Sequence, residues 1–223
     1  MRIVFVHGAF VRDGAWWWQP TADLLARRGL RSSAAVLPSC EAEPRGDLHD
    51  DVAAVRALLD ASDEPALLVG HSYGGMVITQ AGHHPAVRRL VYVTSFLPDV
   101  GQALADFGGG EPRHVSHGDG TASVRAELVR PLFAQDFDDV TYAAAAARLA
   151  AQNEVVFGQR TTEAAWRVKP STYVVCGDDL ATPPEKQREH AARATDVVEL
   201  PVAHHPFVTR PELVAEVLLQ RTR

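Results

Sequence analysis

A serine lies between a buried-strand pattern and a helical pattern, and this junction restricts the fold more than any other local feature. Residues 70–74 read Gly-His-Ser-Tyr-Gly and directly follow the apolar run Ala66–Val69. This G-x-S-x-G spacing favours a sharp strand-to-helix turn that projects the hydroxyl of Ser72 over the edge of a sheet. The pattern alone is common by chance, so the rest of the chain must supply chemical partners for Ser72.

Short apolar strands alternate with helical patterns along most of the chain. The expected strands are apolar on both faces, as in a covered parallel sheet; they are Ile3–Val6, Arg31–Leu37, Ala66–Val69, Leu90–Val93, Thr172–Cys176 and Val197–Leu200. The expected helices are Trp17–Arg27, Leu48–Leu59, Tyr73–Gly82, Pro184–Ala194 and Pro211–Gln220. The alternation predicts an α/β fold with a doubly wound, mostly parallel sheet of about six strands and helices on both faces.

One long segment interrupts this alternation. From about residue 98 to about residue 169 the chain has no convincing core strand, and its periodic patches, such as Ala143–Leu149, are helical. We therefore expect a single domain over residues 1–223 with a helical cap insertion at approximately 98–169. A cap there would cover the carboxyl ends of the strands, where ligands bind in open α/β sheets. The alternative is a surface excursion with no gating role.

Composition excludes several classes of protein. The formal net charge of −6 argues against a nucleic-acid or anionic-membrane surface. The two cysteines suit neither a disulfide framework nor a zinc site. The apolar run at Ile3–Val6 is too short for a signal peptide, and no apolar stretch reaches the length of a membrane span. We expect a soluble cytoplasmic protein that contacts neither nucleic acid nor membrane.

An acidic residue and a histidine follow two later strands, as a serine nucleophile requires. A serine hydroxyl needs a base within hydrogen-bond reach, a group that orients this base, and donors for the oxyanion. Asp178-Asp179 follows the expected strand ending at Cys176, and His204-His205 follows the one ending near Leu200. The order Ser–Asp–His suits this architecture. Only one member of each adjacent pair can fill the role, and spacing alone leaves both choices open.

Oxyanion donors are expected from two backbone segments. The amide of Tyr73, directly after the serine, fits the first, and the positive end of the following helix points the same way. The loop His7–Phe10 after the first strand fits the second, with Ala9 favoured as the donor. The alternative for this loop is a simple tight turn.

Two other clusters are interpreted as structural. Trp16–Trp18 lies near the expected site, but such a cluster more often packs in a core than lines a pocket. His114, His117 and Asp119 offer metal-ligand side chains, but they lie in a glycine-rich stretch without a fourth ligand, which favours a solvated loop. We predict no metal site and no cofactor.

Three segments of the chain resemble the α/β-hydrolase superfamily, and more closely its small branch of plant methylesterases, hydroxynitrile lyases and related bacterial esterases. They are residues 5–10 with 14–16, residues 69–76, and residues 173–185 followed by His204. The resemblance implies an α/β-hydrolase fold, with Asp179 as the acid, since in this branch the acid stands a few residues before a Pro-Glu pair. It also implies His204 as the base and Ala9 and Tyr73 as oxyanion donors. We further expect His205, Phe10 and His71 to line the site.

Two residues depart from the lyase members of this branch, which have a threonine where Gly8 stands and a lysine where His205 stands. The absence of this threonine and this lysine from the chain favours ester hydrolysis. We therefore expect a serine hydrolase that cleaves carboxylic esters of small, largely apolar substrates through an acyl-enzyme. The alternatives are a lyase, lactone-opening or carbon–carbon-cleaving enzyme with the same triad, or a small-molecule-binding module on a hydrolase fold. By analogy with relatives, we also expect a homodimer.

Overall fold

A six-stranded, all-parallel sheet forms the centre of the computed structural model, which describes residues 1–41, 46–109 and 111–222. The spatial order of its strands is β2-β1-β3-β4-β8-β9. Their bounds are β1 Arg2–Val6, β2 Ser32–Ala34, β3 Ala66–His71, β4 Val87–Val93, β8 Ser171–Cys176 and β9 Asp196–Leu200. The main helices are α1 Gly14–Ala26, α2 Leu48–Asp60, α3 Gly74–Ala81, α6 Pro184–Ala191, α7 Pro206–Thr209 and α8 Pro211–Arg221. The predicted α/β fold is confirmed.

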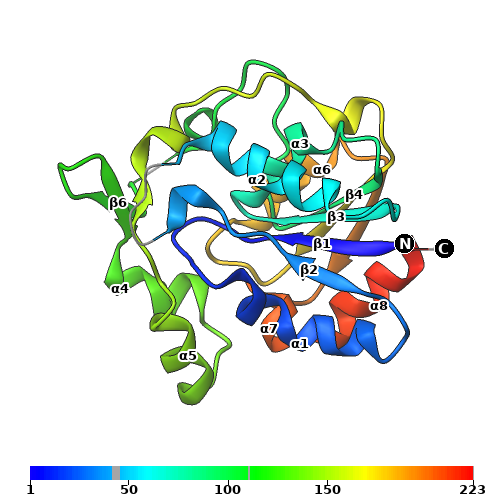
Figure 1. The fold of residues 1–223 in the computed structure, drawn as a ribbon. Helices are drawn as coiled ribbons and strands as arrows, with labels where there is room; N and C mark the ends of the chain where they lie inside the picture. Colours follow the sequence, from blue (N-terminus) through cyan, green and yellow to red (C-terminus); the bar gives the residue numbers. More distant parts are fainter. Residues whose placement is uncertain (42–45, 110, 223) are drawn as a thin grey trace.

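Helices cover both faces of the sheet, as the doubly apolar strands require. Figure 1 shows α2, α3 and α6 on one face and α1, α7 and α8 on the other. Alternate residues of one strand feed the two cores: Val4 of β1 packs on the α2–α3 side, and Phe5 packs on the α1–α8 side. On that second side the ring of Trp18 stacks between Phe5 and Phe207, with ring centroids 4.3 and 3.9 Å away. Trp18 therefore has the core role expected for this cluster.

The parallel register brings several loops to one edge of the sheet. Val6 at the end of β1 pairs with Gly70, and His71 at the end of β3 pairs with Val93. Cys176 at the end of β8 pairs with Leu200 of β9. The chain therefore leaves β1, β3, β4, β8 and β9 close together at the carboxyl edge, where ligands bind in such sheets.

Strand β2 is shorter than expected. The sequence predicted a strand over Arg31–Leu37, but only Ser32–Ala34 is in β2. It is an edge strand that pairs with β1 alone, and one further bond, from Ala35 N to Phe5 O, ends the ladder. Pro38, which has no N–H to donate, then starts a short 3₁₀ turn.

The segment between β4 and β8 is less helical than expected. It holds a three-stranded antiparallel sheet of β5 His114–Ser116, β6 Thr121–Val124 and β7 Gln152–Asn153. Its helices are short: α4 spans Ala126–Leu128 and α5 spans Asp139–Ala146. Figure 1 shows β6, α4 and α5 beside the carboxyl edge of the central sheet. Gly110 of this segment lies outside the described residues. No helix in the described ranges is long and apolar enough to cross a bilayer.

Candidate active site

Ser72 occupies a strained turn between β3 and α3. Its φ of 50° lies in the left-handed region, which non-glycine residues rarely adopt. The surrounding glycines are sterically required. A Cβ on Gly74 would lie 2.6 Å from the carbonyl oxygen of Val6, and one on Gly75 would lie 2.0 Å from that of Phe96. The backbone thus packs tightly beneath the serine while the side chain stays partly exposed.

Asp179 is a buried carboxylate directed at His204. Its Oδ2 atom accepts a 2.8 Å hydrogen bond from Nδ1 of His204, and it also accepts from the hydroxyl of Thr94. Its Oδ1 atom accepts the backbone N–H groups of Ala181 at 2.7 Å and Thr182 at 2.9 Å. Burial tends to raise the pKa of Asp179, but the charge and hydrogen bond of His204 and the Thr94 and backbone donors outweigh it and hold this pKa below its usual range.

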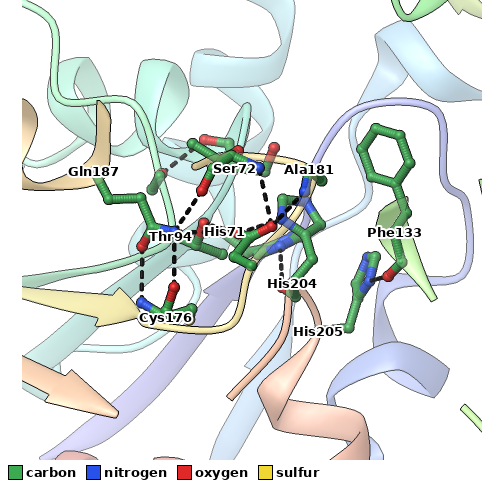
Figure 2. A network of polar contacts seen from close by, with 12 residues as sticks. His71, Ser72, Thr94, Phe133, Cys176, Ala181, Gln187, His204 and His205 are labelled. Carbon is green, nitrogen blue, oxygen red and sulfur yellow. Dashed lines mark hydrogen bonds and ion pairs between the residues drawn. The ribbon is translucent and has the colours of Figure 1, made fainter. Parts of the chain in front are cut away.

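The structure separates the two members of each ambiguous pair. The backbone of Asp178 bonds to neighbouring loops, whereas its carboxylate makes no bond to either histidine among the described residues. His205 lies beside His204 but donates from Nδ1 to the carbonyl oxygen of Phe133 at 2.8 Å (Figure 2). Burial and the neighbouring His204 lower the pKa of His205 to about 3, so its imidazole is neutral near pH 7. Of the two histidines, His204 is the one that bonds to the buried Asp179 among the described residues.

His71 is the last residue of β3, the strand that leads to Ser72. Its Nε2 atom donates to the backbone oxygen of His204 at 3.0 Å (Figure 2). Burial and the nearby His204 and His205 hold the pKa of His71 well below its usual range. This bond joins the end of β3 to the loop after β9, and so links the serine turn to the histidine.

The backbone N–H groups of the two expected oxyanion donors are available near Ser72. Among the described residues, those of Ala9 and Tyr73 make no hydrogen bond. The N–H of Phe10, by contrast, donates to Oε1 of Gln152 at 3.2 Å. Phe10 has a φ of 62°, so this loop, like the serine turn, has a strained backbone. The residues expected to supply oxyanion donors therefore have unoccupied amides.

A buried polar network joins these two segments, and the sequence did not indicate it. Nε2 of Gln152 donates to the hydroxyl of Ser39 at 3.0 Å, and this hydroxyl donates to Asp51 at 2.6 Å. The phenol of Tyr73 donates to the same carboxylate oxygen of Asp51 at 2.7 Å. A chain of hydrogen bonds therefore runs from the loop after β1 to the residue that follows the serine. Only a folded chain brings Gln152 to Phe10, 142 positions away.

The Ser72 hydroxyl and His204 face the same cavity, although no hydrogen bond joins them among the described residues. Catalytic hydrogen bonds are often long before substrate binds and shorten in the complex. The cavity measures about 920 Å³ and is lined by Ala9, Tyr73, Phe10, His71 and His205 as well. All the residues expected at the site except the buried Asp179 therefore border one space.

The segment from residue 98 to 169 supplies much of the apolar wall. The larger aromatic and aliphatic residues that it adds to the lining are Leu104, Phe107, Val124, Val129, Phe133, Phe137, Tyr142, Leu149 and Phe157. Trp17 also borders the cavity, so the expectation that it serves only core packing is incomplete. His114 is a second such case, because its ring stacks on Phe157 at 5.0 Å and faces the cavity rather than a solvated loop.

Comparison with known proteins shows which family the chain is similar to. The model of the alpha/beta hydrolase family matches residues 3–217. The chain is 29% identical to Alpha/beta hydrolase nvfD of Aspergillus novofumigatus over 97% of this chain and 94% of that protein. It is 33% identical to Methylesterase 8 of Arabidopsis thaliana, over 44% of this chain and 39% of that one. The crystal structure of a pyrethroid hydrolase from Sphingobium faniae superposes with a TM-score of 0.85 at 27% identity, covering 99% and 96% of the two chains.

The family model, the nvfD relative and the pyrethroid hydrolase structure match almost the whole chain, and the solved structure agrees with its overall fold. The resemblance predicted from the sequence is confirmed. The chain is a hydrolase that belongs to the alpha/beta hydrolase family.

Proposed function

We propose that this protein hydrolyses carboxylic esters with Ser72 as nucleophile, His204 as general base and Asp179 as the acid that orients it. The observation that carries the proposal is the buried His204–Asp179 hydrogen bond, formed beside the strained serine turn on one cavity. Because Nδ1 of His204 donates to Asp179, its Nε2 atom has the lone pair that a base needs.

The proposed reaction has two halves. Ser72 attacks the ester carbonyl while Nε2 of His204 takes its proton, and the amides of Ala9 and Tyr73 bind the oxyanion. His204 then protonates the leaving alkoxide, which frees the alcohol and leaves an acyl-enzyme. Water, activated by the same imidazole, releases the acid and restores Ser72. The α3 N-terminus beside Tyr73 adds a favourable partial charge.

The Gln152–Ser39–Asp51–Tyr73 network supports this assignment of the oxyanion donors. Gln152 accepts the N–H of Phe10, whereas the N–H of Ala9 makes no hydrogen bond among the described residues. The phenol of Tyr73 is held by a carboxylate that has no exposed surface, so its backbone N–H has a fixed direction. We propose that the network preorganises both donors.

Two observations favour hydrolysis over a lyase reaction. A Cβ on Gly8 would lie 2.9 Å from Nδ1 of His71 and 3.1 Å from the Cβ of Ser72, so the threonine of the lyase members has no room there. His205 stands where those members have a lysine, and its lowered pKa leaves it without the charge that a lysine would supply. A racemic cyanohydrin should therefore remain uncleaved while a phenyl ester is hydrolysed.

We propose that the segment from 98 to 169 acts as a cap that selects the substrate. Its apolar lining suits apolar acyl and alcohol groups, and a volume of about 920 Å³ is enough for a drug-sized ester. The relative named Pyrethroid hydrolase makes bulky apolar esters a sensible part of a substrate panel. The proposal is tested with nitrophenyl esters of graded acyl size and aryl esters of graded alcohol size.

The decisive experiment combines turnover with labelling of the nucleophile. A fluorophosphonate should label the native protein at Ser72, as mapped by mass spectrometry of peptides, and Ser72→Ala should remove both labelling and ester turnover. Turnover that survives in Ser72→Ala would remove the serine from its role. Native protein that neither labels nor hydrolyses any ester of the panel would favour a ligand-binding module.

We also propose a cytoplasmic location and a homodimer. Cys40 and Cys176 are buried and unpaired, which supports a reducing compartment. Fractionation of the source cells tests the location. The dimer follows from analogy with relatives, and light scattering coupled to size exclusion tests it, because the mass of one chain would contradict it.

A further inference from the structure

Three buried imidazoles meet beside Ser72, although the proposed reaction needs only one. The rings of His71, His204 and His205 form a triangle whose centroid separations are 4.7, 4.9 and 4.8 Å. Figure 2 shows the three side chains grouped together, with His205 directed at Phe133. Their exposed fractions are 2%, 2% and 7%, and all three border the cavity. Two of these imidazoles thus have no role in ester hydrolysis as proposed.

Each ring uses one nitrogen as a donor to a fixed acceptor. His204 donates to the Asp179 carboxylate, His205 to the carbonyl oxygen of Phe133, and His71 to the carbonyl oxygen of His204. A carbonyl oxygen only accepts, so the tautomers of His71 and His205 follow from their partners. The remaining nitrogens, Nε2 of His204, Nε2 of His205 and Nδ1 of His71, therefore carry lone pairs.

This is the arrangement of metal-ligating histidines, whose second nitrogen donates to a carboxylate or backbone carbonyl that orients the ring. One nitrogen from each of the three rings can be chosen so that all lie within 4.8 Å of one another. Nitrogens at about 2.1 Å from a tetrahedral zinc ion lie about 3.4 Å apart. Metal binding therefore requires the three rings to move toward the centre of the cluster, so that their nitrogens come closer by roughly an ångström.

The absence of a side chain at Gly8 leaves Nδ1 of His71 accessible to an ion. A Cβ at this position would lie 2.9 Å from Nδ1 of His71, so the missing side chain leaves that side of the ring uncovered. Gly8 and the three histidines all border the cavity, which gives an ion a route from solvent. Imidazole nitrogens suit Zn²⁺, Cu²⁺ or Ni²⁺, whereas Mg²⁺ and Ca²⁺ prefer oxygen ligands.

We propose that His71, His204 and His205 form a binding site for a divalent transition metal, with Zn²⁺ as the reference ion, and that the bound ion inhibits the hydrolase. The ion takes the lone pair of His204 Nε2, which is the pair that must accept the Ser72 proton. The inhibitory consequence rests on the proposed function, but metal binding itself does not. No sequence pattern indicates this site, because it joins His71 to His204, which only the fold brings together.

The test measures Zn²⁺ binding directly, by calorimetry on protein first treated with a chelator and freed of it. We expect one Zn²⁺ per chain in the native protein and in Ser72→Ala, since the serine is not a ligand. His205→Ala should weaken binding by at least about 100-fold, whereas the matched change His83→Ala at an exposed histidine should not. Mg²⁺ should show no binding at the same concentration.

The proposal is overturned if native protein binds no Zn²⁺, or if His205→Ala binds it as tightly as His83→Ala does. If circular dichroism shows that His205→Ala does not fold, the test uses the native protein instead. Co²⁺ is added to it and the visible absorption spectrum is recorded. Tetrahedral Co²⁺ absorbs visible light far more strongly than octahedral aqueous Co²⁺, and a spectrum equal to that of aqueous Co²⁺ contradicts the site. Ester turnover measured in chelator tests the proposed function separately, so an active enzyme without Zn²⁺ binding refutes only the metal site.

Discussion

The phenol of Tyr73 donates a 2.7 Å hydrogen bond to the carboxylate of Asp51, a side chain with no exposed surface. Asp51 belongs to α2, while Tyr73 directly precedes α3 and follows the proposed nucleophile. Burial raises the pKa of Asp51, although the bonds from Ser39 and Tyr73 favour the ionised form. This pair therefore ties the backbone beside Ser72 to a helix that lies outside the site.

Removing the Tyr73 hydroxyl tests how much its hydrogen bond to Asp51 stabilises the fold. Tyr73→Phe should lower the free energy of unfolding by about 1.5–3 kcal/mol, because a buried carboxylate loses a donor. The control is Tyr92→Phe, which loses a 2.9 Å bond to the hydroxyl of Thr79 and should cost about 1 kcal/mol. Urea denaturation of both variants provides the comparison, and a larger loss in Tyr92→Phe would contradict the prediction.

Gln152→Leu tests whether the network positions the oxyanion loop. The variant removes the acceptor of the Phe10 N–H and the donor to Ser39, so kcat should fall by about 10–100-fold with little change in KM. Gln159→Leu is the matched control, since Gln159 also accepts a backbone N–H, that of Leu48, but does not border the cavity. Steady-state kinetics should show a kcat effect in the first variant only. Equal kcat values in both would argue for a purely structural network.

The adjacent aspartates allow a direct test of the proposed acid. Asp179→Asn keeps the size of the side chain but removes the charge that fixes the tautomer of His204, so kcat should drop by about 10⁴-fold. Asp178→Asn makes the same change one position earlier and should alter kcat less than about threefold, because its carboxylate does not reach either histidine among the described residues. Similar losses in the two variants would reject Asp179 as the acid.

The serine turn should not tolerate a side chain at Gly75. A Cβ there would lie 2.0 Å from the carbonyl oxygen of Phe96 and 2.2 Å from Oγ of Ser95, so Gly75→Ala should cost at least about 1–3 kcal/mol and reduce activity. Gly109→Ala serves as control because a Cβ at that position would meet no atom within 4 Å. Thermal unfolding compares the two, and equal melting temperatures would show that the turn relaxes freely.

The stability of helix α2 should depend on pH through Asp47. This residue caps the helix by accepting the N–H groups of His49 at 2.7 Å and Asp50 at 3.0 Å. Partial burial tends to raise its pKa, but the bond from Gln159 and the backbone donors outweigh this and lower it. A lowered folded-state pKa means that the stabilisation is complete above the unfolded pKa near 3.9 and is lost as the pH falls through the folded value.

Asp47→Ala should therefore cost about 1 kcal/mol at pH 7 and much less near pH 2. Urea unfolding at several pH values measures the difference between the variant and the native chain. A cost that stays constant down to pH 2 would mean that the charge of Asp47 contributes nothing to the cap.

Local patterns were enough to predict the central sheet and the chain order of the candidate site. Apolar runs such as Ala66–Val69 are short and bounded by turn residues, which identifies them as strands. Each candidate site residue lies within a few positions after such a strand, so its place at the sheet edge can be predicted from the adjacent sequence. Strand β2 was overestimated because an apolar run does not reveal how far its single partner, β1, extends.

Long-range pairings could not be read from the sequence. The small sheet β5–β7 depends on Gln152–Asn153 returning to Thr121–Ala122, and a two-residue strand has no periodicity to detect. The contacts of Gln152 with Phe10 and of His71 with His204 join segments far apart in the chain. Such residues look like ordinary loop or strand positions until the fold brings their partners near.

The left-handed backbone at Ser72 limits which nucleophiles descendants of this chain could evolve. Threonine has a comparable hydroxyl, but its branched Cβ is strongly disfavoured at a φ of 50°. Cysteine has an unbranched Cβ and a stronger nucleophile, so this backbone admits a thiol at the position where it disfavours a threonine.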